Sequence, residues 1–153
     1  LYSMITSDYY LFVIHLVSTS FMVGVIWIVQ LVHYPTFLFI DEQKSNDFQK
    51  FHMSRISYIV MPAMTTELFS GIYIYIYSNM AIESNLFLLA LTILIINWII
   101  TALVFVKMHN KLLINYKIEI ISLLVKWNWL RTLLWSVRLI LLLRMAYLDK
   151  VLD

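Results

Sequence analysis

Apolar residues along this chain gather in four long runs that carry few charged side chains. A helix that crosses a bilayer needs about 20 mostly apolar residues. Four segments meet this length, and we expect membrane-spanning helices at about residues 10–32, 58–77, 86–106 and 129–147. The run Ile72–Tyr77 alternates like a strand. A lone strand would leave its backbone groups unpaired in lipid, so the prediction there is also a helix.

Polar segments separate the four runs. Residues 41–47 follow the first run and residues 78–85 the second. Residues 107–128 form a longer basic segment with interleaved Leu and Ile, a pattern typical of a helix that lies in the membrane interface or extends its neighbours. The pattern therefore predicts an all-α fold over residues 1–153, a single integral membrane domain built as a four-helix transmembrane bundle with up-down topology.

The composition agrees with a membrane environment. Hydrophobic residues make up 62% of the chain and charged residues 13%, whereas a soluble domain carries about 25% charged residues. A soluble fold of this size could not bury so much apolar surface. The net charge of +2 is too small to indicate a nucleic-acid partner. The expected partner is the lipid bilayer, with self-association or other membrane subunits as further partners.

Lysine and arginine lie mostly on one side of the predicted bundle. The side formed by the first turn and residues 107–131 holds Lys44, Lys50, Arg55, Lys107, Lys111, Lys117, Lys126 and Arg131. The opposite side holds Arg144 and Lys150. Because basic loops stay in the cytoplasm, this asymmetry predicts that the basic side is cytoplasmic and that both termini are non-cytoplasmic.

A first polar layer is expected at the middle of the membrane. Counting 1.5 Å per residue along each helix places Glu67, Asn97 and Arg138 near the centres of their spans, at the same depth as Ser18–Ser20. A lone charge at this depth costs several kcal/mol. We therefore expect a buried Glu67–Arg138 pair, with Asn97 and a hydroxyl completing its hydrogen bonds. Glu67 is a candidate proton carrier and Arg138 its partner, unless the pair only fixes helix register.

A second polar layer is expected near the cytoplasmic face. Gln30 and His33 end the first span, His52 and Arg55 precede the second, and His109 follows the third. Imidazole is a good ligand for zinc, copper and iron, so His33, His52 and His109 are candidate ligands for a transition metal or haem. Gln30 and Arg55 are candidates to help bind that cofactor. The alternative is that these histidines merely face lipid headgroups.

The fourth span begins with Asn128 and Arg131, two further candidates for the active site. Arg131 suits an anionic group because guanidinium binds carboxylates through two parallel hydrogen bonds; contact with lipid headgroups is the alternative. Asn128, Arg131, Trp135, Arg138 and Leu142 follow one another at spacings of three and four residues, which predicts the inward seam of a packed helix. Aromatic residues of the cytoplasmic side are expected to form an interfacial belt: Trp27, Tyr34, Tyr58, Trp127 and Trp129.

Several short motifs carry a resemblance. They are Gln30–Pro35 (QLVHYP), His52–Ile56 (HMSRI), Pro62–Met64 followed by Glu67, and Asn128–Thr132 (NWLRT) followed by Trp135. As a set, over about residues 15–143, they resemble a family of short bacterial four-helix membrane proteins of unassigned function. The resemblance implies a membrane bundle in a bacterial inner membrane. His15 and Pro35-Thr36-Phe37 are also similar to a motif of the four-helix membrane protoporphyrinogen oxidases, but they lie too far apart for that chemistry to carry over.

Three functions remain open from the residues. The first is a membrane-embedded enzyme or haem protein with a polar, histidine-containing site near the cytoplasmic face, using haem or a metal for redox chemistry on a lipid-soluble substrate. The second is a non-catalytic accessory subunit of a larger membrane complex. The third is a small proton-coupled transporter component in which Glu67 carries protons.

Overall fold

The computed structural model describes residues 2–78 and 84–148, and helices make up nearly all of this part of the chain. The predicted all-α class is confirmed for these residues. The long helices are α1 (Tyr2–Ile28), α3 (Ser45–Tyr77), α4 (Ser84–Ile100) and α6 (Ile118–Leu148). Shorter pieces extend two of them: α2 (Tyr34–Thr36) follows α1, and α5 (Val106–Ile114) follows α4.

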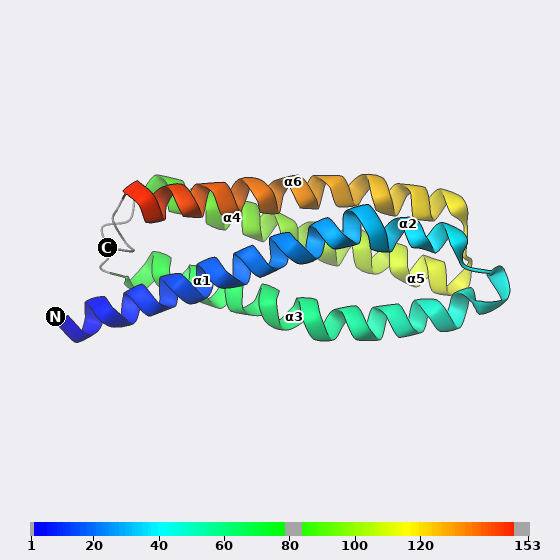
Figure 1. Cartoon of the computed structure of the whole chain (residues 1–153), viewed down its shortest axis with the longest axis horizontal. Helices are drawn as coiled ribbons and strands as arrows, with labels where there is room; N and C mark the ends of the chain where they lie inside the picture. Colours follow the sequence, from blue (N-terminus) through cyan, green and yellow to red (C-terminus); the bar gives the residue numbers. More distant parts are fainter. Residues whose placement is uncertain (1, 79–83, 149–153) are drawn as a thin grey trace.

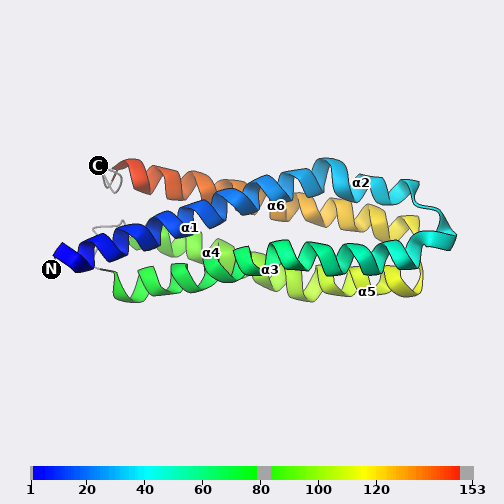
Figure 2. The same ribbon diagram turned by 60° about the horizontal axis from the view of Figure 1, so that its bottom comes forward.

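The helices pack side by side into an elongated bundle (Figure 1). Helix α1 contacts both α3 and α6, α4 also contacts α6, and α3 contacts α4 and α5. Successive long helices run in opposite directions, and α1 begins at the same end of the bundle where α6 ends (Figures 1 and 2). The turn between α5 and α6 and the connection between α2 and α3 both lie at the other end, which we call the connection end.

Three of the helical segments are long and apolar enough to cross a membrane. They are Asp8–Phe39, Glu42–Tyr77 and Asn85–Ile114. Helix α6, the fourth predicted span, does not meet this composition, since Arg131, Arg138 and Arg144 interrupt its apolar run. Two of these arginines are buried within the bundle, which removes their charge from the outer surface.

The helices are longer than the spans expected from hydropathy. Helix α3 begins at Ser45, so residues 45–57 are helical and extend the second span toward the connection end. The basic segment 107–128 is divided: residues 107–114 belong to α5 and residues 118–128 to the first turns of α6. The helix Ser45–Tyr77 also includes the alternating run Ile72–Tyr77, as predicted.

Two π-helical turns widen the bundle near the connection end. Val29–His33 separates α1 from α2, and Thr101–Phe105 separates α4 from α5. In the first of them the backbone N–H of Tyr34 bonds the carbonyl of Val29, a five-residue step that rotates the following residues about the helix axis. This rotation turns Tyr34 toward the interior, where it is 4% exposed.

The core alternates between apolar and polar levels. Phe12, Ile74, Phe87 and Leu142 form one apolar cluster where α1 begins and α6 ends. Other apolar clusters centre on Trp135 and, at the connection end, on Phe37. The buried polar side chains described next lie among these clusters.

Candidate functional site

Glu67 and Arg138 form a buried ion pair, as the sequence predicts. Arg138 Nη1 donates to Glu67 Oε1, and neither side chain has any exposed surface. The second carboxylate oxygen accepts a hydrogen bond of 3.3 Å from Trp135 Nε1. The pair therefore joins α3 to α6 in the interior of the bundle.

The remaining donors of Arg138 bond groups on α1 and α4. Nη1 donates to Thr19 Oγ1 (2.6 Å), Nε donates to the carbonyl of Ala90 (3.2 Å), and Nη2 contacts His15 Nε2 (2.8 Å). Because a guanidinium can only donate, His15 Nε2 must accept. His15 is then neutral with its proton on Nδ1, which donates to Ser70 Oγ at 2.7 Å. One arginine thus connects all four long helices.

Asn97 does not join this network, contrary to the prediction from depth. Its side chain is fully buried, yet neither amide atom has a hydrogen-bond partner. On α4 it is the carbonyl of Ala90 that meets Arg138. Ala90 lies seven residues from Asn97, about 10 Å along a helix. The assumption of equal depth at the centre of each apolar run was therefore wrong for α4, because helices can slide along their axes.

Gly71 makes room for His15. A Cβ atom at Gly71 would lie 2.8 Å from His15 Cε1 and 3.2 Å from Leu91 Cδ1. The ring of His15 is held between Ser70 and Arg138, so it has little freedom to move away. Glycine at this position lets α3 approach α1 closely enough for the network to close.

The three candidate histidine ligands gather at the connection end. His33 Nε2 and His52 Nδ1 are 2.6 Å apart in a hydrogen bond, and the ring centres of His52 and His109 are 5.0 Å apart. Gln49 Nε2 donates to His109 Nδ1 at 2.7 Å, and His109 Nε2 is 3.2 Å from the hydroxyl of Tyr34. We call these five residues the imidazole cluster.

The imidazole cluster is not arranged as a metal site. Two nitrogens that bind one metal at about 2.0 Å each must be about 3 Å or more apart, whereas His33 and His52 bond each other directly. Both nitrogens of His109 face protein partners. Over residues 2–78 and 84–148, no group of three or more His, Cys, Asp or Glu could hold a metal ion. The arrangement of the described residues therefore gives no support to a three-histidine ligand set, which stays a prediction.

Arg55 lies outside the imidazole cluster, whereas Tyr34 is a member of it that differs from its predicted position. Arg55 is exposed, and its guanidinium lies over the ring of Phe51 at 5.4 Å, although its backbone is one turn from His52. Tyr34 was expected in an interfacial aromatic belt, but it is buried and belongs to the imidazole cluster. The π-helical turn before Tyr34 accounts for this change of face.

Arg131 lies next to the cluster without a carboxylate partner. It is 5% exposed, and Nη1 donates to Asn128 Oδ1 at 3.3 Å. Asn128 in turn donates to Gln30 Oε1 at 2.9 Å. The hydroxyl of Tyr34 lies close to the guanidinium, which also faces the rings of Phe105 and Trp135 at 4.2 and 5.2 Å.

A small cavity borders Arg131, and we call it the inner cavity. Its volume is about 160 Å³. Apolar groups on its wall include Ile26 and Phe105, and polar groups come from five residues: Tyr34, Ser57, Thr101, His109 and Arg131. Further lining residues are exposed on the outer faces of α3 and α5: Ser57, Met61 and Val106. The cavity therefore opens sideways between α3 and the α4–α5 segment.

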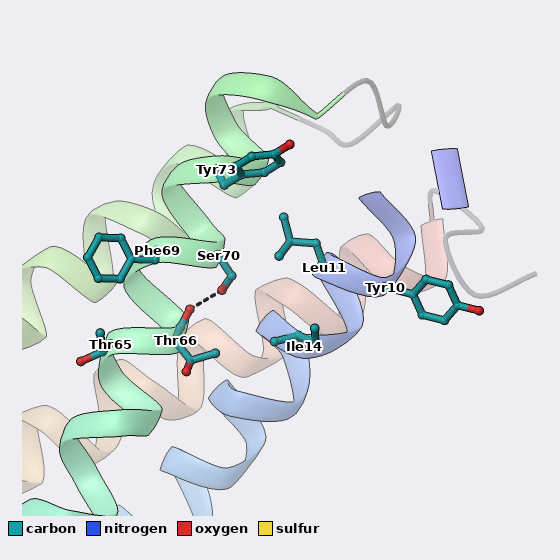
Figure 3. A pocket seen from close by; sticks show the side chains of 8 residues that line it. All are labelled: Tyr10, Leu11, Ile14, Thr65, Thr66, Phe69, Ser70 and Tyr73. Carbon is teal, nitrogen blue, oxygen red and sulfur yellow. Dashed lines mark hydrogen bonds between the residues drawn. The ribbon is translucent and has the colours of Figure 1, made fainter. Parts of the chain in front are cut away.

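Two other hollows lie on the outside of α1 and α3. One, of about 350 Å³, is lined by His33, His52, Arg55 and apolar residues. The larger, of about 650 Å³, lies toward the opposite end (Figure 3). Figure 3 shows Ser70 on α3 turned toward Leu11 on α1, with its hydroxyl bonded to the carbonyl of Thr66. No charged side chain lines this larger hollow, so its size alone does not make it the chemical site.

Sequence reasoning found most members of the network, including a hydroxyl on α1, which is that of Thr19. It did not foresee the contact of His15 with Arg138. A signal was present, because buried residues on α1 and at the start of the following π-helical turn recur at spacings of three and four: Phe12, His15, Thr19, Met22, Ile26 and Val29. The inward seam predicted on α6, Asn128 to Leu142, is confirmed by the burial of its members.

The geometry is the present basis for assigning a function. Comparison with protein-family models, with characterised proteins and with solved structures finds no match to this chain.

Proposed function

We propose that this chain is a four-span integral membrane protein that binds a lipid-soluble molecule in the inner cavity, with the polar head of that molecule at Arg131. The observation that carries the proposal is a nearly buried arginine without a carboxylate partner on the wall of a cavity that opens sideways. A sideways opening suits a ligand that arrives from the acyl chains rather than from water.

The membrane part of the proposal rests on where polar and apolar side chains lie. Large apolar side chains are exposed along the outer faces of every long helix, for example Phe21, Phe69, Ile99 and Ile140. Charged and polar groups are buried instead, among them Glu67 and Arg138. A soluble protein rarely exposes such continuous apolar surface. In this arrangement α6 is the fourth span, because its arginines at the membrane interior are covered by the other helices.

The orientation follows from the loop charges. The connection end carries most of the lysines, including Lys44, Lys111 and Lys117. The positive-inside rule places this end in the cytoplasm and both termini outside. The inner cavity then lies in the cytoplasmic half of a bacterial inner membrane, the membrane that the sequence resemblance implies.

Two members of the imidazole cluster, Tyr34 and His109, form part of the polar wall of this site. Its hydrogen bonds leave no gap for a metal between His33 and His52, so it supports positioning of a ligand headgroup better than metal-dependent or haem-dependent redox chemistry. His109 and Tyr34 line the inner cavity directly and can exchange hydrogen bonds with a bound headgroup.

The test is to identify what co-purifies with the protein. Lipophilic molecules are extracted from detergent-purified protein and compared by mass spectrometry between the native chain and Ser57→Trp, which blocks the mouth of the cavity. The matched control is Leu133→Trp, an exposed position that does not line the cavity. A lipophile retained by the native chain and Leu133→Trp, but lost from Ser57→Trp, supports the proposal. Equal retention by all three contradicts it.

A second candidate function, a proton-coupled transporter component, is favoured by a chain of contacts between the larger hollow and the inner cavity. Ser70 borders the larger hollow and bonds His15, and His15 bonds Arg138. Arg138 bonds Glu67, and Trp135 contacts both Glu67 and Arg131, which lines the inner cavity. Two titratable groups, His15 and Glu67, belong to this chain. If this function holds, Glu67→Gln that still folds should lose proton flux in liposomes. Unchanged flux would exclude it.

A further inference from the structure

Arg131 carries the one strongly unbalanced charge in the described interior of the bundle. Its environment consists of Asn128, the hydroxyl of Tyr34 and two aromatic faces. None of these groups is an anion. By contrast, Arg138 is equally buried but has Glu67 as its counter-ion. A buried ion without a partner costs several kcal/mol in a low-dielectric interior.

One hydrogen-bond donor of Arg131 also lacks an acceptor. Its Nε is buried and has no hydrogen-bond partner, although the same residue lines the inner cavity. Nε and a terminal nitrogen of guanidinium form a planar fork that matches the two oxygens of a carboxylate. A carboxylate would therefore supply both the missing charge and the missing acceptor.

The dimensions of the cavity limit the size of the group that enters. A volume of about 160 Å³ is comparable to that of an engineered cavity of about 150 Å³ that binds a molecule the size of benzene. This space holds a carboxylate and a few methylene groups, but not two acyl chains with a glycerol backbone. The rest of a single chain would leave through the mouth beside Ser57, Met61 and Val106 and lie against the apolar faces of α3 and α5.

From these features we infer that the ligand is a single-chain amphiphile with a carboxylate head, of the fatty-acid class, bound through Arg131. The inference rests on the proposed function, since it specifies the molecule that the inner cavity takes. Tyr34 and His109, together with the hydroxyl groups of Ser57 and Thr101, are further polar groups that line the cavity.

The test uses a single thiol at the mouth of the cavity. The chain has no cysteine, so Ser57→Cys provides one labelling site in the otherwise complete protein. The protein is placed in phosphatidylcholine nanodiscs, and the rate of maleimide labelling is measured against dodecanoate or dodecanol at about pH 8, where a carboxyl group is ionised. Ligand concentrations are corrected for partition into the bilayer.

The expected result is that dodecanoate slows labelling at a concentration about 10- to 100-fold lower than dodecanol does, the range of a charge-assisted hydrogen-bond pair. Arg131→Gln should reduce this preference to about one. Arg131→Lys, which keeps the charge but not the planar fork, should give an intermediate preference. The matched control is Arg144→Gln, because Arg144 is an exposed arginine of the same helix and should leave the preference unchanged.

The outcomes separate the inference from the proposed function. Equal protection by dodecanoate and dodecanol in the native background contradicts the inferred carboxylate head of the ligand. It is still compatible with a cavity that binds lipophilic molecules. Absence of protection by either overturns both. If phosphatidylglycerol in the nanodisc protects the thiol and dodecanoate does not, the occupant is a phospholipid and the inference fails. The comparison of dodecanoate with dodecanol in the native background uses no substitution at Arg131. It therefore remains valid even if an Arg131 variant does not fold.

Discussion

Substitution of Gly71 by alanine should displace His15 and so disrupt the hydrogen-bond network around Arg138. The added Cβ would lie 2.8 Å from His15 Cε1, closer than non-bonded carbon atoms approach in proteins. The ring of His15 cannot turn away without losing its bond to Ser70 or to Arg138. The other glycine, Gly24, lies on the exposed side of α1, and its Cβ would have no neighbour within 4 Å.

The expected magnitude follows from three contributions. Overpacking a filled interior costs about 1–3 kcal/mol, and loss of a hydrogen bond to the charged Arg138 costs about 1.5–3 kcal/mol. Replacement of glycine by alanine inside a helix stabilises the helix by about 1 kcal/mol. Gly71→Ala should therefore lower the free energy of unfolding by about 1.5–5 kcal/mol, whereas Gly24→Ala should raise it by up to about 1 kcal/mol.

The measurement is equilibrium unfolding in mixed micelles, followed by circular dichroism, for both alanine variants and for His15→Ala with and without Gly71→Ala. Removing the imidazole opens space for the new methyl group, so Gly71→Ala should cost little in the His15→Ala background. The reasoning would be refuted by equal stability of the two glycine variants. It would also be refuted if the Gly71→Ala and His15→Ala losses simply added.

Three further predictions concern the rest of the site. Glu67→Gln leaves Arg138 without a counter-charge and should cost about 3–5 kcal/mol of stability; Arg138→Met in the same chain should recover most of it, and additive losses in a double-mutant cycle would contradict the pairing. His52→Ala should destabilise the fold by about 1–3 kcal/mol, while Arg55→Ala, at an exposed position, should change stability by less than about 0.5 kcal/mol. Burial raises the pKa of Tyr116 to about 12, above its usual value of about 10, so its contribution to stability should be complete below about pH 10 and disappear as the pH rises toward 12. Tyr116→Phe should abolish this loss, and a stability profile identical to that of the native chain would contradict it.

The Tyr116 contact also explains why the connection end stays closed. Its hydroxyl donates to the backbone carbonyl of Phe37 at 2.9 Å, which joins the turn before α6 to the segment after α2. Asn46 donates to the carbonyl of Leu113 at 2.8 Å, which joins α3 to the end of α5. The carbonyl of Leu113 lies in the last turn of α5, where backbone carbonyls lack partners within the helix, whereas that of Phe37 also accepts from the backbone N–H of Ile40. The two side-chain bonds hold the connections beside the imidazole cluster, so the cluster remains covered.

The helical class and the pairing of Glu67 with Arg138 both follow from the pattern of residues along the chain. Long apolar runs leave only helices as economical structures in lipid, and two opposite charges within such runs have few alternatives to meeting each other. The same argument predicted the inward seam of α6, since Arg131, Trp135 and Arg138 recur at helical spacing. These conclusions depend on periodicity and on the cost of charge burial, and both can be read without coordinates.

The rotation of the helices and their shifts along one another follow only from the packing of the folded chain. The axial shift of α4 brings Ala90 rather than Asn97 to Arg138, and the π-helical turn turns Tyr34 inward. The imidazole nitrogens bond protein groups rather than an open ligand position. A shift along the axis or a turn of one residue changes which side chains meet, while the hydrophobic pattern stays the same. For this reason the pattern predicted the members of the site, but their partners and the cavity beside Arg131 followed only from the packed fold.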